Sequence, residues 1–201
     1  MDNNNAKPQQ NQLSIEINPQ TTKVSYSNLA IISHSRSEFV LDFAATLPGL
    51  PKALVGDRII MTPEHAKRLM NALFDNISKY EAQFGVIDLS GNNGKPQQNQ
   101  LSIEINPQTT KVSYSNLAII SHSRSEFVLD FAATLPGLPK AQVGSRVIMT
   151  PEHAKRLMNA LFDNMSKYEA QFGVIDLSSG KPQAGSTFDL GNFGPLGGNK
   201  S

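Results

Sequence analysis

Residues with the chemistry of a hydrolase lie close together at Ser33, His34 and Ser35, with Glu38 and Asp42 nearby. A hydroxyl nucleophile, an imidazole base and a carboxylate that orients the base are the parts of a catalytic triad. The same residue types are typical of a polar hairpin loop, and neither serine lies in the glycine pattern of a nucleophile elbow. We therefore favour the loop interpretation and expect no catalytic residue here.

A metal site is the second chemistry that the sequence raises. His65 directly follows Glu64, whereas the zinc protease motif needs the histidine first and a second histidine one turn later. The chain has four histidines and no cysteine, so carboxylates would have to complete any metal site. No glycine-rich phosphate loop is present. We expect a protein that is not an enzyme and has no cofactor or metal.

Basic side chains raise a third chemistry, the binding of single-stranded nucleic acid. Tyr26, Phe39 and Phe43 are candidates for stacking on bases, and Lys67 and Arg68 mark the expected centre of a basic patch, with Lys79 as a further candidate. Such binding needs clustered positive charge, whereas residues 7–90 carry eight basic and eight acidic residues. Solvated surface charges and core phenylalanines are the alternative. The main candidates are Arg36, Lys52, Arg58, Lys67 and Arg68. Their equivalents 88 positions later are Arg124, Lys140, Arg146, Lys155 and Arg156.

Composition narrows the class of protein further. The 201 residues have a net charge of +1, and the absence of cysteine excludes disulfides and thiolate metal sites. No apolar run reaches the roughly 18 to 20 residues of a membrane span, and the first residues lack the basic and apolar regions of a signal peptide. We expect a cytoplasmic protein with no membrane partner.

Internal repetition dominates the organisation of the chain. Residues 7–90 recur as 95–178, and only four positions differ, namely Leu54/Gln142, Asp57/Ser145, Ile59/Val147 and Ile77/Met165. Such near-identity indicates a very recent duplication or a deliberate single-chain fusion of a homodimer, and we favour the fusion. The expected organisation is a flexible N-terminus at 1–12, copy one at 13–90, a linker at 91–100, copy two at 101–178 and a flexible tail rich in Gly and Ser at 179–201.

Each copy contains the pattern of four strands and a helix. Alternating apolar residues predict strands over 13–17, 24–32, 38–45 and 52–61, with a bulge near Asn28 in the second and a kink at Gly56 in the fourth. Thr62 as N-cap, Pro63 at the first turn and Gly85 at the end define a long helix. Its predicted buried stripe consists of Ala66, Leu69, Met70, Leu73, Phe74, Ile77 and Tyr80. The fold class is α+β, with four antiparallel strands followed by one helix (ββββα) in each copy.

One helix covers only one face of a sheet, so the opposite face needs a cover. The predicted opposite face carries Ala30, Ile32, Val40, Ala44 and Ile60. We expect the two copies to be each other's partner, with sheet packed on sheet and the helices outside, as a pseudo-twofold single-chain dimer. Two independent domains are the alternative. Leu54/Gln142 and Asp57/Ser145 exchange different chemistries and are expected to be partly exposed, whereas Ile59/Val147 and Ile77/Met165 are core-type exchanges.

Two motifs in each copy carry a resemblance to a known family. The segments SHSRSEFVLDF (33–43) and MTPEHAKRL (61–69), with Leu47-Pro48-Gly49 between them, resemble a family of small bacterial proteins known only as a domain of unknown function. The resemblance implies a protein of about one copy's length and assigns no site residue. The four-strand and helix topology is also similar to that of the Whirly and PUR single-stranded nucleic-acid binders, which is an analogy of fold alone.

The sequence therefore favours a non-enzymatic binding module built from a repeated bacterial domain. Single-stranded nucleic acid is the most concrete ligand. The alternative is a module for protein assembly that docks a protein partner through its sheet edges or through its tail, which carries Phe188 and Phe193.

Overall fold

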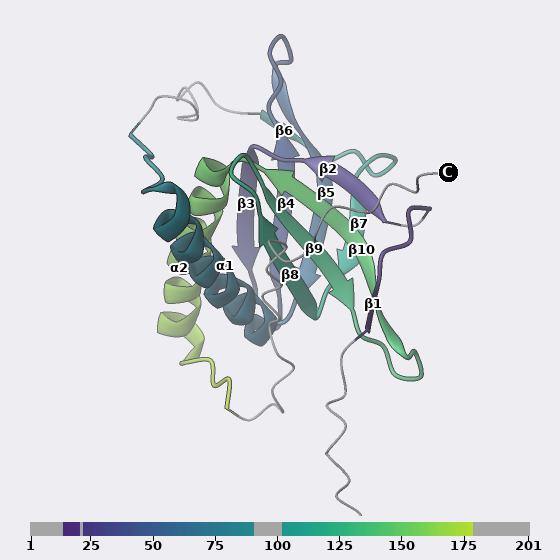
Figure 1. Ribbon diagram of the computed structural model, residues 1–201. Coiled ribbons are helices and arrows are strands. Elements are labelled where there is room, and N and C mark those ends of the chain that lie inside the picture. The colour runs from purple at the N-terminus through teal and green to yellow at the C-terminus, as the bar shows by residue number, and fades with distance from the viewer. Residues whose placement is uncertain (1–13, 21, 91–101, 179–201) are drawn as a thin grey trace, which may run out of the picture.

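The computed structural model describes residues 14–20, 22–90 and 102–178, and it has an α+β fold in which strands precede a helix twice (Figure 1). The predicted flexible segments and linker, 1–12, 91–100 and 179–201, lie outside the described residues. The first repeat contains β1 (Ser14–Glu16), β2 (Lys23–Tyr26), β3 (Leu29–His34), β4 (Phe39–Ala45), β5 (Lys52–Met61) and α1 (Pro63–Phe84). The second contains β6 (Ser102–Glu104), β7 (Lys111–Tyr114), β8 (Leu117–His122), β9 (Phe127–Ala133), β10 (Lys140–Met149) and α2 (Pro151–Phe172).

The predicted strand over 24–32 is in fact two strands in different sheets. The chain crosses between the sheets at Ser27 and Asn28: the Ser27 amide donates to Ile148 O (2.9 Å) and the Asn28 amide to Ala44 O (3.1 Å). The Ser27 hydroxyl bonds Leu29 O and Ala44 O, which satisfies the backbone at the crossing. The expected irregularity near Asn28 is therefore a change of sheet, and each copy has five strands where four were predicted.

The copies exchange their N-terminal strands. β1 and β2 lie one after the other along β10 and pair with it in parallel, while β10, β9 and β8 are antiparallel. In the same way β6 and β7 lie along β5, which continues to β4 and β3. The prediction of four antiparallel strands thus holds for the last three strands of each copy and is wrong for the N-terminal segment. Each sheet is a half-barrel made by both copies.

Helix α1 begins and ends where its capping residues predict. Thr62 is the N-cap, Pro63 opens the helix, and Gly85 follows it with φ 96°, a conformation that favours glycine. Leu69, Leu73 and their helical neighbours are buried as predicted. The predicted stripe is too wide along one edge, because Phe74 is 60% exposed and Met70 is only half-buried. Phe162, the equivalent of Phe74 on α2, is also 60% exposed.

Both sheets and both helices share one main core. The face of β4 that carries Phe39, Leu41 and Phe43, called the inner face here, contacts Tyr168 of α2 at one end and Phe131 of the other sheet at the other. Helix α1 packs on β8 and α2 on β3, and Figure 1 shows the helices side by side on one side of the sheets. The expectation of helices outside a sheet sandwich is therefore wrong, because they fill the space where the inner faces diverge.

The register also corrects which residues share a face. Ala30 and Ile32 pair with Phe43 and Leu41 and pack against the main core, because the change of sheet before β3 resets the alternation. Val40, Asp42 and Ile60 lie on the opposite, outer face. Among the described residues neither helix combines the length and apolar composition that crossing a membrane requires.

Candidate binding faces and contacts between the copies

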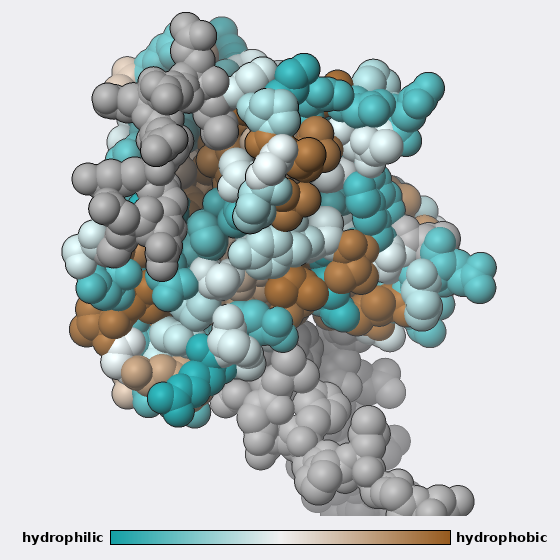
Figure 2. All heavy atoms as spheres, turned by 90° about the horizontal axis from the view of Figure 1, so that it is seen from above, coloured by the Kyte–Doolittle hydropathy of each residue, from teal (hydrophilic) through white to brown (hydrophobic). Residues whose placement is uncertain are grey.

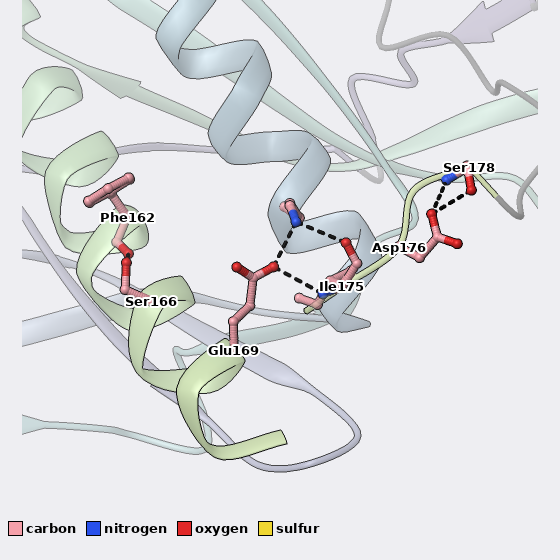
Figure 3. Close-up of polar contacts among 7 residues, drawn as sticks. Phe162, Ser166, Glu169, Ile175, Asp176 and Ser178 are labelled. Carbon is pink, nitrogen blue, oxygen red and sulfur yellow. Dashed lines mark hydrogen bonds and ion pairs between the residues drawn. The ribbon is translucent and has the colours of Figure 1, made fainter. Parts of the chain in front are cut away.

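Lys67, a candidate for nucleic-acid binding, instead joins the two copies. Its ammonium donates to Glu169 Oε1 (2.6 Å) and to Ile175 O (2.9 Å), and the Ile175 amide donates to the same carboxylate oxygen (Figure 3). The hydrogen bond from Lys67 is the main cause of a lowered pKa at Glu169. Arg68, the next residue, donates to Leu177 O (3.4 Å), so both cations of this pair contact the end of α2 and the segment after it.

The second copy repeats this arrangement. Lys155 donates to Glu81 Oε1 (2.6 Å) and Ile87 O (2.9 Å), and Arg156 to Leu89 O (3.4 Å). Lys155 likewise lowers the pKa of Glu81. We call these two sets of contacts the helix latches. They hold the N-terminal half of each helix to the C-terminal end of the other.

The arginines on the outer faces are paired with carboxylates. Arg58 makes a bidentate contact with Asp42, through Nε to Oδ1 (2.7 Å) and Nη2 to Oδ2 (2.8 Å), and Arg146 does the same with Asp130 at 2.6 and 2.7 Å. These hydrogen bonds raise the pKa of each arginine. The carboxylates leave each pair with no net charge. This part of the outer face therefore has polar groups that can form hydrogen bonds, but it attracts phosphate only weakly.

The remaining basic candidates are dispersed. Lys52 pairs with Glu104 (3.2 Å) in an exposed contact, and the Arg36 guanidinium lies 5.9 Å from the Phe172 ring centroid. Lys79, Arg124 and Lys140 are exposed. Lys67 and Arg68 lie on a helix at the core side of the sheets, whereas Arg58 lies on the outer face. The structure thus separates the residues that the sequence grouped into a single patch.

Exposed tyrosines mark an apolar surface on each sheet. The register places Tyr26 beside Ile148 and Val128, and Val24 beside Arg146 and Asp130; we call these six residues the Tyr26 face. The Tyr114 face is its counterpart on the other sheet and consists of Val112, Tyr114, Arg58, Ile60, Val40 and Asp42. Tyr26 is 49% and Tyr114 50% exposed, whereas Phe39 and Phe43, the other stacking candidates, are buried in the core.

Both tyrosine faces are composite. β2 comes from copy one while β10 and β9 come from copy two, and the other face has the reverse origin. In the view of Figure 2, hydrophobic residues are exposed in patches between hydrophilic ones. Sequence alternation showed that Val24 and Tyr26 share a side of their strand, but the identity of the neighbouring strand carried no local signal.

The triad-like residues do not come together. His34 stacks on Phe39 (5.3 Å between ring centroids) and touches Tyr168, on the core side of β3. Asp42 is on the outer face of β4, held by Arg58. The Ser35 and Ser37 hydroxyls bond each other across the turn at 3.4 Å. The serine, histidine and aspartate therefore serve a loop, an aromatic cluster and an ion pair respectively.

The two copies differ most at a buried polar position. Asp57 and Ser145 are both fully buried, so their expected partial exposure is wrong, whereas Leu54 is 43% exposed and Gln142 is also exposed. The Ser25 hydroxyl donates to Asp57 Oδ2 (2.5 Å), and Asp57 Oδ1 has no hydrogen-bond partner among the described residues. At the matching position the Ser145 and Ser113 hydroxyls lie 3.3 Å apart.

The other two differing pairs are core residues, as predicted. Ile59 and Val147 are fully buried, and Ile77 and Met165 are 3% and 2% exposed. No group of three or more His, Asp or Glu side chains suited to a metal ion occurs within residues 14–20, 22–90 and 102–178.

The repeat and its fold define a tandem α+β protein whose two units complete each other's sheets. The model of a family described as protein of unknown function (DUF3467) matches the chain twice, over residues 1–89 and 90–177, so the chain belongs to this family and carries its domain in two copies. This confirms the resemblance carried by the two sequence motifs. No match was found among curated proteins or among solved structures.

Proposed function

We propose that this protein is a non-enzymatic, bivalent binding module of the bacterial cytoplasm that docks one protein partner on each tyrosine face. The single observation that carries the proposal is the composition of these faces, in which an exposed tyrosine and valine border a neutralised Arg–Asp pair and half-buried aliphatic residues. Tyrosine, arginine and aliphatic side chains around a desolvated centre are typical of protein interfaces.

The arrangement of the copies supports two equivalent sites in each chain. Each tyrosine face needs β2 or β7 from one copy and two strands from the other. A partner that recognises one face therefore recognises the paired state of the domain. With two faces, one chain brings two partner molecules together, which is the behaviour of an assembly module.

A site-specific photo-crosslinker tests this proposal in cells of the source organism. We expect a crosslinker at Tyr26 or Tyr114 to trap the same partner, and one at the exposed residue Asn71 of α1 to trap none. Native mass spectrometry of the purified complex should give two partners per chain, and one after Val24→Asp. Equal trapping at all three positions, or a complex unaffected by Val24→Asp together with Val112→Asp, would overturn the proposal.

Single-stranded nucleic acid is the second candidate, and the two exposed tyrosines on sheet surfaces are the observation that favours it. The analogy with Whirly and PUR topologies supports it at the level of fold only. Its test is the anisotropy of labelled single-stranded DNA and RNA at about 50 mM salt, where phosphate contacts give binding that weakens steeply as salt rises. Salt-sensitive binding that Tyr26→Ala and Tyr114→Ala weaken would favour this candidate over a protein partner.

A further inference from the structure

Two equivalent cavities lie where a helix of one copy meets the sheet-crossing segment of the other. The larger has a volume of about 260 Å³. Its wall includes Leu29 of copy one and, from copy two, Met149, His153, Arg156, Leu157 and Ala160. The residues 88 positions away line the second cavity, whose volume is about 30 Å³.

Helical spacing explains why one side of the larger cavity combines charge with apolar surface. His153, Arg156, Leu157 and Ala160 are at positions i, i+3, i+4 and i+7, so they lie on one face of α2 near its N-terminus. Leu29 follows directly after the change of sheet and closes the opposite side. The wall of the cavity is therefore made by both copies.

Arg156 forms no direct ion pair within the described part of the chain, and Glu152, one helical turn earlier, is the carboxylate whose pKa its charge helps to lower. The one hydrogen bond of Arg156 there is a long contact from Nη2 to Leu89 O (3.4 Å), and the buried Nε has no acceptor among the same residues. An unpaired buried donor is costly, and more so when it is charged. This differs from Arg58 and Arg146, each of which holds a carboxylate with two hydrogen bonds.

The neighbouring histidine adds no second charge. His153 Nδ1 lies 2.8 Å from Thr150 Oγ1, and burial together with the charge of Arg156 lowers the pKa of His153. The nearby Glu152 has a lowered pKa, first through its hydrogen bond with Thr150, and its side chain is exposed. The imidazole is therefore neutral at pH 7 and next to the Arg156 guanidinium, where its own titration reports on any added negative charge.

We propose that the larger cavity binds a small alkyl carboxylate, with the carboxylate on Arg156 and the alkyl chain against Leu29, Met149 and Leu157. A carboxylate fits because it gives a guanidinium two acceptors in one plane. The volume fits because an apolar cavity of about 150 Å³ already holds benzene. This site is separate from both tyrosine faces and does not depend on the proposed function.

Hexanoate and the neutral hexan-1-ol are matched probes for the full chain. The four histidines can be followed by NMR, and His153→Gln identifies the resonance of interest. We expect hexanoate to shift the His153 resonance saturably and to raise its pKa, and hexan-1-ol to bind at least about tenfold more weakly because it lacks the charge-assisted hydrogen bonds. Absence of a saturable shift with hexanoate, or equal affinity for the two probes, overturns the proposal.

Variants in the two cavities provide the controls. Arg156→Gln should remove the preference for hexanoate, whereas Arg68→Gln in the smaller cavity should leave it unchanged. If Arg156→Gln does not fold, Ala160→Leu tests the site without removing the charge, because it fills the cavity, and Ala72→Leu is its control. Hexanoate binding that survives both Arg156→Gln and Ala160→Leu, or survives Ala160→Leu alone when the arginine variant is unfolded, contradicts the assignment.

Discussion

The strands β5 and β10 place two different residues in closely similar surroundings. Asp57 in β5 and Ser145 in β10 follow the glycine of an equivalent β-bulge, and each lies within reach of a serine on a strand of the other sheet. Ser25 supplies one short hydrogen bond to the carboxylate of Asp57, whereas the Ser113 and Ser145 hydroxyls, each able to donate or accept, lie 3.3 Å apart, which is long for a hydrogen bond between hydroxyls.

The difference shows that the repeat does not need a charge at this position. A fully buried carboxylate with a partnerless oxygen costs free energy unless other groups compensate it. In copy two the serine occupies the same position without a charge and with one oxygen to hydrogen-bond instead of two. Because the rest of the chain is nearly identical, each copy is an internal control for the other.

The largest expected effect tests whether the copies are equivalent in their shared core. Phe43 and Phe131 contact each other with ring centroids 5.4 Å apart, and both are about 1% exposed. Phe43→Ala and Phe131→Ala should each lower the free energy of unfolding by about 3–5 kcal/mol, and by equal amounts, in denaturant titrations. The double variant should lose less than the sum because the residues share a contact.

Phe74→Ala is the control for these core variants. Phe74 is 60% exposed, so its removal should cost less than about 0.5 kcal/mol. Losses at Phe43 and Phe131 that differ by more than about 1 kcal/mol, well beyond the scatter of independent sites, would show that the two halves of the core are not equivalent.

The second prediction exchanges the buried polar residues. Ser145→Asp should lower the free energy of unfolding by about 2–3 kcal/mol at pH 7, because it buries a second carboxylate at a position where Ser113 is the hydroxyl within reach and the nearby Lys111 ammonium already donates to Gly144 O. Asp57→Ser should raise it by about 1 kcal/mol by removing the unpartnered oxygen. Ser145→Asn introduces a side chain of nearly the same size as aspartate but without its charge, so comparing the two variants separates the cost of the charge from the cost of the added size. A neutral outcome for Ser145→Asp would mean that groups beyond those described satisfy a carboxylate at this position.

The third prediction concerns the helix latches, which are alike in the two copies. Lys67→Met and Lys155→Met should each cost about 1–2 kcal/mol, because each removes a partly buried charge-assisted hydrogen bond and leaves a carboxylate with one partner fewer. Equal costs would indicate equal latches. A loss at only one lysine would show that one latch dominates the helix contact.

Acid pH should weaken both latches. Glu81 and Glu169 have lowered pKa values in the folded protein, mainly through Lys155 and Lys67. Their stabilisation is therefore fully present above the unfolded glutamate pKa of about 4.3 and is lost as pH falls through the lower folded values. The double variant Lys67→Met/Lys155→Met should show a shallower loss of stability below that pH than the parent chain.

Local patterns predicted the elements better than their partners. Helix α1 could be placed from Thr62, Pro63 and Gly85, and the inner face of β4 from the spacing of Phe39, Leu41 and Phe43. The exchange of β2 between the copies could not be predicted, because the alternation of apolar and polar residues in β2 is compatible with any neighbouring strand. Phe74 was misplaced because helical spacing does not show how wide a face the neighbouring elements cover.

The candidate sites were predictable only in part. The sequence identified Arg58 and Tyr26 as binding candidates, but the pairing of Arg58 with Asp42 depends on the register of β4 and β5. The spacing of His153 and Arg156 is compatible with one helix face, but no sequence pattern predicted their pairing, and the opposite wall of their cavity comes from residues more than a hundred positions earlier in the chain. Asp57 was expected to be partly exposed because aspartate and serine, which occupy this position in the two copies, differ in charge and size.

The smallest expected effect is at Leu54 and Gln142, the differing pair that the structure leaves exposed. Leu54 is 43% exposed and lies beside Glu104 at the rim of its sheet, and Gln142 has the equivalent place beside Glu16. Leu54→Gln and Gln142→Leu should each change the free energy of unfolding by less than about 0.5 kcal/mol, because both positions are at the surface and away from the main core. A shift in stability above about 1 kcal/mol that grows with protein concentration would place this rim inside an interface between chains, since only association makes stability depend on concentration.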